Sequence, residues 1–284
     1  MRSPRTVDVM PLDSRRFRLG EGGRWDGTDF WQVDLLDGNL WRSAGGTEIL
    51  QQVLDLDVPV GAMAHVAGGG HLVIAGTGAA LVGDAGTLDW IGRPVDGLQP
   101  PRRVNDAAVS GGRLFFGTMD FPGSMGNGQL WRVDPDRTVT ALLDGLGCPN
   151  GPACSPDGST LYLADSTAGE IRRHRIADDG SLVDGALFVT IPPDVGVPDG
   201  MTVDADGHLW VALWNGAAVA RFDPAGDWAD LIGLPVHRPT SVTIADGRML
   251  ITSAHNDLAE PGELDGATLV LATDAAAPVA AVFG

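Results

Sequence analysis

Four oxygen-bearing side chains stand out because similar short segments recur along the chain. Glu21 lies in Leu-Gly-Glu-Gly, while Asn105, Asn150 and Asp199 lie in Val-Asn-Asp, Pro-Asn-Gly and Pro-Asp-Gly, at intervals of about 45 to 50 residues. Two carboxylates held 4 Å apart repel each other by about 4 kcal/mol at an effective dielectric of 20. A divalent cation would offset that repulsion, and oxygen-only donors suit Ca²⁺, Mg²⁺ or Mn²⁺.

Each of these segments, taken singly, is also typical of a turn. Asn-Gly and Asp-Gly are strong turn formers, and Asp-Gly occurs at Asp157, Asp206 and Asp246 with no need for a metal. A shared site is favoured only if the four side chains occupy equivalent places in a repeated unit. The repeat that would position them is therefore the next question.

Six strand-like runs recur at intervals of about 40 to 48 residues. Most follow a turn rich in Gly, Asp or Asn, as the second strand of a β-hairpin does. The runs begin at Phe30, Leu72, Leu114, Leu161, Leu209 and Met249. A second hairpin follows in most units, so each period holds four short strands, which is typical of one blade of a β-propeller. We predict an all-β protein, a six-bladed β-propeller with four-stranded blades, formed by residues 1–284 as a single domain. A two-sheet sandwich would not explain why the same turn and strand segment recurs six times.

The propeller gives the four side chains a common location. They lie about 9 to 11 residues before the hairpin strands, which places them at the start of innermost strands, at one end of the central channel. The other two blades carry Ala62 and Thr240 at the matching position. For ring closure, we expect the tail at 267–272 or 278–283 to share a blade with the stretch 6–17.

The composition limits the classes of partner. The 40 glycines and 19 prolines favour short strands, and the net charge of −18 would repel nucleic acid. No stretch of about 20 apolar residues and no leader-like start are found, so we expect no membrane association and a cytoplasmic location. Cys148 and Cys154 are too few for a disulfide framework and are interpreted as packing residues. The six histidines form no pair at ligand spacing, and we expect a small-molecule substrate and a monomer or small homo-oligomer.

The motifs together resemble the SMP-30/gluconolactonase/regucalcin family. They are Leu-Gly-Glu-Gly-Gly-Arg-Trp from 19, Pro-Arg-Arg-Val-Asn-Asp from 101, Gly-Thr-Met from 117, Pro-Asn-Gly-Pro-Ala-Cys from 149, Pro-Asp-Gly-Met from 198 and Arg-Pro-Thr-Ser-Val from 238. The resemblance implies a six-bladed propeller with one divalent metal in the channel. It implies Glu21, Asn150 and Asp199 as ligands, Asp199 also as base or water-positioning residue, and Arg103 and Asn105 as the substrate-binding pair.

Three segments depart from that family's pattern. Gly23 stands where a proline is usual, the residues at 107 and 108 are alanines in place of Gly-Lys, and Asp120-Phe-Pro follows Gly-Thr-Met in place of an acidic pair. We assign Asp120 as a substitute substrate-contacting acid, one or two positions early. The loop 120–128 is interpreted either as a mobile lid or as an ordinary exposed hairpin loop.

The resemblance predicts a divalent-metal-dependent hydrolase that opens a lactone ring, with a sugar lactone (aldonolactone) as substrate. Ca²⁺ is the first choice of metal, with Mg²⁺, Mn²⁺, Zn²⁺ or Fe²⁺ as alternatives. Two other functions stay open: an enzyme of the same architecture acting on another ester, an organophosphate or a specialised metabolite, and a non-catalytic metal-binding propeller. No Gly-x-Ser-x-Gly and no His-Glu-x-x-His segment occurs, so other hydrolase chemistries lack support.

Overall fold

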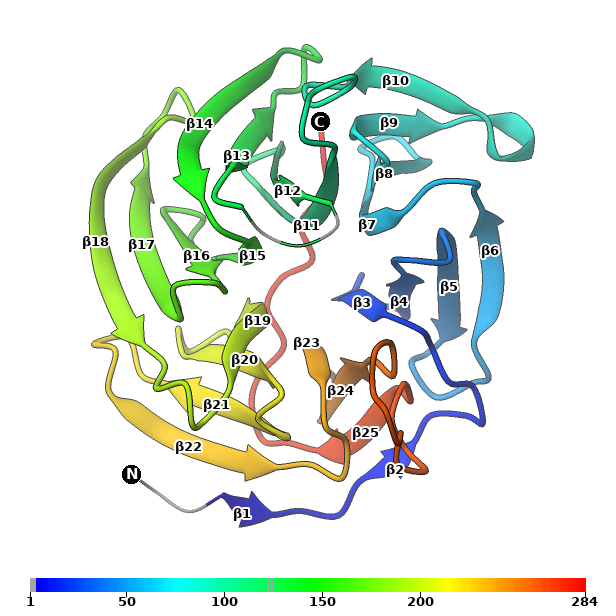
Figure 1. Ribbon diagram of the computed structural model, residues 1–284, viewed down its shortest axis with the longest axis vertical. Coiled ribbons are helices and arrows are strands. Elements are labelled where there is room, and N and C mark those ends of the chain that lie inside the picture. The colour runs from blue at the N-terminus through cyan, green and yellow to red at the C-terminus, as the bar shows by residue number, and fades with distance from the viewer. Residues whose placement is uncertain (1–3, 122, 124) are drawn as a thin grey trace.

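Six antiparallel sheets form a closed ring around a central axis, as the prediction of a six-bladed propeller required (Figure 1). The computed structural model describes residues 4–121, 123 and 125–284. In this part of the chain almost all regular structure is β-strand, apart from the short 3₁₀ turn Asp84–Gly86. No helix in the described part is long and apolar enough to cross a membrane.

Each blade is built from strands that follow one another in the chain. The first blade is β3 (Gly20–Trp25), β4 (Asp29–Asp34), β5 (Asn39–Ala44) and β6 (Gln51–Asp55). The second is β7 (Val60–His65), β8 (His71–Ala75), β9 (Gly78–Val82) and β10 (Leu88–Gly92). The third is β11 (Arg102–Ser110), β12 (Arg113–Asp120), β13 (Gly128–Val133) and β14 (Val139–Leu146). The fourth is β15 (Pro149–Cys154), β16 (Thr160–Asp165), β17 (Glu170–Ile176) and β18 (Leu182–Thr190).

The last two blades also hold the strands near the N-terminus. The fifth is β19 (Val197–Val203), β20 (Leu209–Trp214), β21 (Ala218–Phe222) and β22 (Trp228–Gly233), with β1 (Arg5–Thr6) paired in parallel to β22. The sixth is β23 (Pro239–Ala245), β24 (Arg248–Ser253), β25 (Leu269–Ala272) and β2 (Met10–Pro11). Met10 pairs with Val270 in antiparallel register. The predicted closure through 267–272 is thus confirmed.

Hairpin turns of the predicted kind join the first and second strands of the blades. Gly158, Gly207 and Gly247 adopt positive φ angles of 72°, 86° and 69° in these turns. Such angles strain any residue with a Cβ atom, which accounts for glycine after aspartate in these segments. The six predicted runs form the second strands of their blades, β4, β8, β12, β16, β20 and β24.

Apolar side chains fill the space between neighbouring blades. Phe30, Phe115, Phe116 and Phe222 are the largest fully buried side chains. Removing a phenylalanine side chain from water contributes about 1.5–3 kcal/mol, so these rings hold adjacent sheets together. The blades in turn fix the positions of the innermost strands, β3, β7, β11, β15, β19 and β23, which surround the axis (Figure 1).

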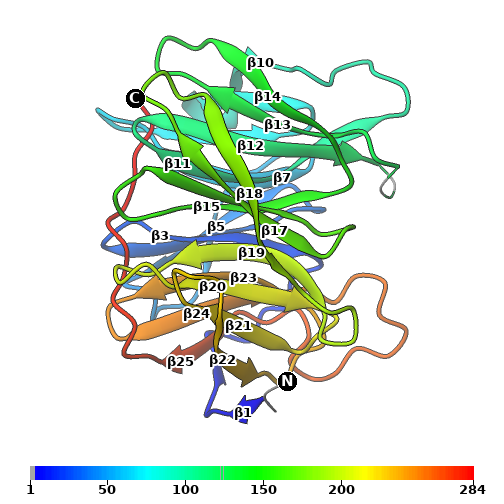
Figure 2. The same cartoon turned by 90° about the vertical axis from the view of Figure 1, so that its left-hand side faces the viewer.

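The C-terminal segment does not join the sixth blade after β25 but crosses the axis on one face of the ring (Figures 1 and 2). The Ala205 amide donates to the Ala276 carbonyl at 3.0 Å, the Phe283 amide to the His65 carbonyl at 2.8 Å, and the Gly284 amide to the Gly112 carbonyl at 3.0 Å. The segment therefore ties the fifth blade to the second and third. We call this face the rear end of the channel, where the innermost strands finish, and the opposite end the front.

Candidate functional site

The four predicted side chains do lie at the front end, near the start of innermost strands. Glu21 is the second residue of β3, Asn150 the second of β15 and Asp199 the third of β19, while Arg103 and Asn105 both lie on β11. None of them is a turn residue, so the turn interpretation is wrong for Asn150 and Asp199. Glu21, Asn105, Asn150 and Asp199 are all buried.

A change of register in each innermost strand explains how these side chains reach the channel. The pairing of β3 with β4 shifts between Glu21 and Arg24, and that of β15 with β16 shifts between Asn150 and Ala153. Corresponding shifts occur in β7, β11, β19 and β23. Such irregularities redirect side chains and increase local twist. In four of the innermost strands the shift coincides with one of the side chains Glu21, Asn105, Asn150 and Asp199.

Glycines beside the bulges allow the innermost strands to come close together. A Cβ atom at Gly61 would lie 2.0 Å from the Asn105 carbonyl oxygen, and one at Gly151 would lie 2.4 Å from the carbonyl oxygen of Asp199. Gly151 also has a φ angle of 46°. Glycine is therefore needed after Asn150 so that β15 can pack closely against the innermost strand of the next blade.

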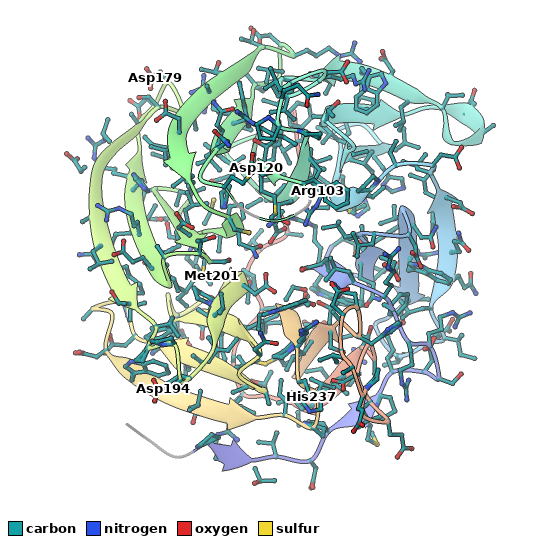
Figure 3. The ribbon with its side chains drawn as sticks, in the orientation of Figure 1. Arg103, Asp120, Asp179, Asp194, Met201 and His237 are labelled. Carbon is teal, nitrogen blue, oxygen red and sulfur yellow. The ribbon has the colours of Figure 1, made fainter. Side chains whose placement is uncertain are left out.

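Direct contacts join the residues from three blades. The Asn150 side-chain amide donates to Asp199 Oδ1 and, at 3.3 Å, to the Ser166 hydroxyl. The Asn105 amide donates to the Pro149 carbonyl at 3.1 Å, and Arg103 Nη1 donates to Asn105 Oδ1 at 2.8 Å. Ser166, which the sequence did not suggest, donates to the Pro198 carbonyl at 2.7 Å. The contacts place Arg103, Asn105, Asn150 and Asp199 in one group, with Arg103 visible near the centre of the ring (Figure 3).

The electrostatics of this group depend on burial. Burial raises the pKa of Glu21 well above its ordinary range, and the charges of Asp199 and Asp106 raise it further. Burial likewise raises the pKa of Asp199, with Asp106 adding to the effect. Arg103 acts in the opposite direction on both carboxyl groups. Three buried acidic groups thus lie close enough to interact electrostatically, with one guanidinium acting on Glu21 and Asp199 in the opposite direction.

Asp106 is a member of the group that sequence analysis missed. It is only 8% exposed, and burial raises its pKa to about 6, although the Ala107 amide donates to Oδ1 at 2.7 Å. Under strict strand alternation it would point away from the side that Asn105 occupies. The bulge between Val104 and Ala107 brings both residues to the channel.

These residues fit a hard divalent cation. Glu21 Oε2 is buried without a hydrogen-bond partner among the described residues, which is costly for a polar atom. Glu21, Asp199 and the Asn150 amide oxygen offer only oxygen donors, as Ca²⁺ prefers. Rotating the Asn150 amide by half a turn exchanges its oxygen and nitrogen, which ordinary structures do not distinguish. No group of three His, Cys, Asp or Glu side chains arranged to hold a metal occurs in residues 4–121, 123 and 125–284. The amide is therefore required for a three-residue ligand set.

Asp120 lies at the end of β12, where it binds its own loop. It is 1% exposed and accepts hydrogen bonds from the Met125 amide at 2.7 Å and from Asn127 Nδ2 at 3.0 Å. Burial alone would raise the pKa of Asp120, but these bonds together lower it. Asp120 thus binds Met125 and Asn127 of the same loop, and its contact with substrate stays a prediction.

The loop after Asp120 contributes an exposed aromatic ring. Phe121 is 44% exposed, and the Arg103 guanidinium lies 5.9 Å from the centre of its ring. The predicted lid 120–128 includes Pro122 and Ser124, which lie outside the described residues. Phe121 thus places an apolar ring beside the Arg103 guanidinium at the front end.

The cysteines and histidines complete the comparison with the sequence. Cys148 and Cys154 are free, partly buried thiols, and burial raises the pKa of each to about 12, which removes them as thiolate nucleophiles. The histidines show no metal-ligand spacing in the sequence, and the structure adds that β7 and β8 pair His65 with His71, whose ring centres lie 5.1 Å apart. The signal was their position on either side of a hairpin turn.

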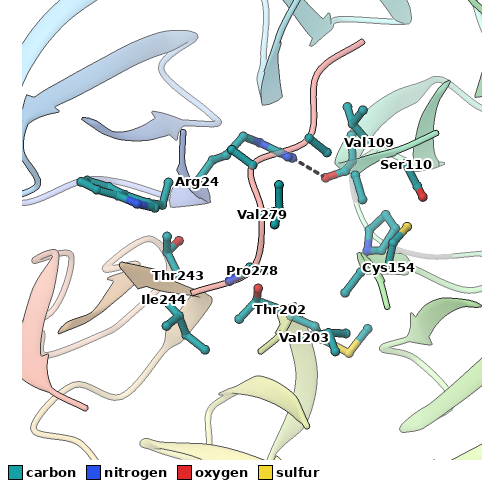
Figure 4. A pocket seen from close by; sticks show the side chains of 18 of the residues that line it. Arg24, Val109, Ser110, Cys154, Thr202, Val203, Thr243, Ile244, Pro278 and Val279 are labelled. Atoms are coloured by element: carbon teal, nitrogen blue, oxygen red, sulfur yellow. Dashed lines mark hydrogen bonds between the residues drawn. The ribbon is translucent and has the colours of Figure 1, made fainter. Parts of the chain in front are cut away.

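A cavity lies at the rear end. It has a volume of about 620 Å³ and is lined by the later residues of the innermost strands, including Arg24, Val109, Thr202 and Thr243, and by the C-terminal residues 278–282. Figure 4 shows Arg24 reaching into this space, with Pro278 and Val279 of the C-terminal segment along one side. Glu21, Asn150 and Asp199 do not line it.

Comparisons of the sequence and of the fold with known proteins lead to related proteins of one family. A sequence profile described as the SMP-30/gluconolactonase/LRE-like region matches residues 19–255. A pentonolactonase of Haloferax volcanii is 33% identical over 268 residues, covering 88% of this chain and 87% of its own. A regucalcin of Xenopus laevis is 30% identical over 270 residues, covering 90% and 89%. The crystal structure of a calcium-binding regucalcin from Agrobacterium tumefaciens superposes with a TM-score of 0.91 over the whole of both chains at 24% identity, which supports the fold.

Proposed function

The chain belongs to the SMP-30/gluconolactonase/LRE-like family, and from that membership we propose that it is a divalent-metal-dependent lactonase that opens the ring of a sugar lactone. The observation that carries the proposal is the convergence of Glu21, Asn150 and Asp199 beside Arg103 and Asn105 at the front end of the channel. The 33% identity to a pentonolactonase over most of both chains supports the reaction class.

Glu21, Asn150 and Asp199 would hold the cation. When bound, it would supply a Lewis acid for the lactone carbonyl and lower the pKa of a nearby water. Its positive charge would also offset the repulsion between the two buried carboxylates. The absence of thiolate or imidazole donors in this set favours Ca²⁺ over softer ions.

Asp199 would take the proton from the attacking water. A general base works best with a pKa near the working pH, and burial moves the pKa of Asp199 upwards from the range of an exposed aspartate. Asn150 lies in direct contact with Asp199, so the two side chains face the same position. Ser166 lies against the Asn150 amide on the other side, at 3.3 Å.

Arg103 and Asn105 would bind and orient the substrate. Arg103 Nε is buried without a hydrogen-bond partner among the described residues, so this donor is available to a lactone oxygen. The contacts from Nη1 to Asn105 Oδ1 and to the Val104 carbonyl, both at 2.8 Å, fix the plane of the guanidinium. A fixed cation of this kind stabilises negative charge that develops on the reacting oxygen.

A pH-indicator assay tests the proposal on a panel of aldonolactones, with a simple ester and a phosphotriester as alternative substrates. We expect hydrolysis of at least one aldonolactone that requires an added divalent metal. Asp199→Asn should lower kcat by at least about 100-fold, the usual scale for losing a general base. Asp246→Asn, in an exposed hairpin turn, is the matched control and should leave kcat unchanged.

Two results would contradict the proposal. One is a protein that binds the metal but hydrolyses no member of the panel, which would favour a non-catalytic metal-binding propeller. The other is hydrolysis that persists at full rate in a metal chelator. Preference for the ester or the phosphotriester over every lactone would keep the metal site but replace the substrate.

A further inference from the structure

The rear cavity carries features of a second ligand site. Its volume of about 620 Å³ lies within the usual range for small-molecule pockets, about 300–1,000 Å³. It is lined by the C-terminal residues 278–282, whose segment crosses the rear face of the ring (Figures 2 and 4). A ligand there would not need to pass the front end of the channel.

Arg24 supplies an unsatisfied cation to this cavity. Its one hydrogen bond within the described part of the chain runs from Nη2 to the Ala107 carbonyl at 3.2 Å, and Nε is buried with no partner there. A guanidinium has five N–H donors, so most remain free. Burial lowers the pKa of Arg24, which reflects the cost of holding the charge away from water.

The acidic groups that line the cavity do not neutralise Arg24 by direct contact. Asp106 acts on it electrostatically, but no described carboxylate comes within the 4.0 Å of an ion pair with it. Asp106 Oδ1 is engaged by the Ala107 amide. Asp26 accepts from Trp31 Nε1 at 2.7 Å and lies 3.1 Å from His65 Nε2. A buried cation without a close partner gains from a matching anion.

A hydroxyl group completes the polar part of the site. Thr243 is 4% exposed, lines the cavity, and its Oγ1 has no hydrogen-bond partner in the part of the chain that is described. Gly23 makes room for this hydroxyl, because a Cβ atom there would lie 2.6 Å from it. Arg24 and Thr243 belong to β3 and β23, which lie in contact, and Figure 4 shows both side chains among those that line the cavity.

Part of the remaining wall is apolar. Val109, Val203 and Ile244 are buried residues of three different blades that line the cavity, and Pro278 and Val279 face them from the C-terminal segment. A phosphate ion or a sugar would leave this surface without a suitable partner. A carboxylate fits the planar fork of an arginine, and an attached apolar group fits the wall.

We propose that the rear cavity, through Arg24 and Thr243, binds a small organic carboxylate that carries an apolar body. The carboxylate would accept from the free Arg24 nitrogens and the Thr243 hydroxyl, and the apolar body would lie against Val109, Val203 and Ile244. The inference does not depend on the lactonase proposal, because none of these residues belongs to the front site.

Isothermal titration of the metal-loaded, full-length protein with benzoate tests this site, and benzamide is the neutral probe of the same shape. We expect one benzoate per chain and at least about 10-fold weaker binding of benzamide, the scale of one charge-assisted hydrogen bond. Arg24→Gln should weaken benzoate binding by at least about 10-fold. Arg93→Gln, which alters an arginine outside the cavity, should have no effect.

A second variant and a crystal structure keep the proposal testable if the Arg24→Gln variant does not fold. Thr243→Val preserves side-chain shape and should weaken benzoate binding several-fold, even if Arg24→Gln does not fold. Crystals soaked with benzoate should show its carboxylate against Arg24. The proposal is overturned if wild-type protein binds no benzoate at millimolar concentration, or if benzamide binds equally well. It is also overturned if binding is lost on metal removal but unchanged by Arg24→Gln, because benzoate would then occupy the front site.

Discussion

Replacing Asp106 by asparagine should stabilise the metal-free protein, although it removes a buried charged group. Burial raises the pKa of Asp106 to about 6 from an ordinary value of 3.8. The unfolded chain therefore releases this proton more readily than the folded one, and ionisation at neutral pH opposes folding. The pKa difference corresponds to about 3 kcal/mol once the pH exceeds the folded-state pKa. This cost falls to about half near pH 5 and almost vanishes near pH 4.

The net gain is smaller because asparagine accepts fewer hydrogen bonds. The Ala107 and Gly151 amides both interact with the Asp106 carboxylate, and loss of one such bond costs about 1 kcal/mol. We expect Asp106→Asn to raise the free energy of unfolding by about 2 kcal/mol near pH 8 and by less than about 1 kcal/mol near pH 5. Urea unfolding in the presence of a chelator at both pH values measures this difference.

A second buried aspartate is the control. Asp204 accepts hydrogen bonds from Trp210 Nε1 at 2.9 Å and from Arg221 Nη2 at 3.2 Å. Asp204→Asn weakens an established ion pair and should destabilise the protein at both pH values. The reasoning about Asp106 is refuted if Asp106→Asn is destabilising by the same amount near pH 8 and near pH 5, because its ionisation would then carry no cost.

Three other predictions concern the metal, the substrate and the C-terminal segment. Glu21→Gln should stabilise the chelator-treated protein at neutral pH, because the raised pKa of Glu21 marks an unfavourable charge. The same substitution should abolish the rise in melting temperature on adding Ca²⁺. If the variant still shows a Ca²⁺-dependent rise, Glu21 is not a metal ligand. Phe121→Ala should raise KM several-fold with little change in kcat, because the ring lies beside Arg103 and outside the hydrogen-bonded group. Steady-state kinetics measure both constants, and a decrease in kcat with an unchanged KM would contradict this prediction. Phe283→Ala should lower the free energy of unfolding by about 3 kcal/mol or more, the scale of a buried phenylalanine, and thermal unfolding that matched wild type would show that the segment does not join the blades.

The blades and the location of the front site could be predicted from the sequence because both depend on a period. The turn residues and apolar runs repeat in every blade, so the strand order followed from local patterns, and β25 belongs to one of the two tail segments expected to close the ring. Asn105, Asn150 and Asp199 share one place in that period, which sets their position near the channel whatever their exact direction.

The direction of individual side chains could not be predicted in the same way. Bulges interrupt the alternation of the innermost strands, so Asp106 reaches the group although it follows Asn105 directly. Asp120 depends on the hydrogen bonds of an irregular loop, which has no period. The rear cavity depends on where the C-terminal segment crosses the ring, and that crossing rests on contacts between distant residues such as Phe283 and His65.

Anomalous diffraction from crystals grown with Mn²⁺, a heavier substitute for Ca²⁺, tests the central claim most directly. The account predicts one strong peak at the front end of the channel, bounded by carboxylate oxygens of Glu21 and Asp199 and by the side-chain oxygen of Asn150. A peak elsewhere on the chain, or fully occupied Mn²⁺ sites that leave these three residues without a metal contact, would contradict it.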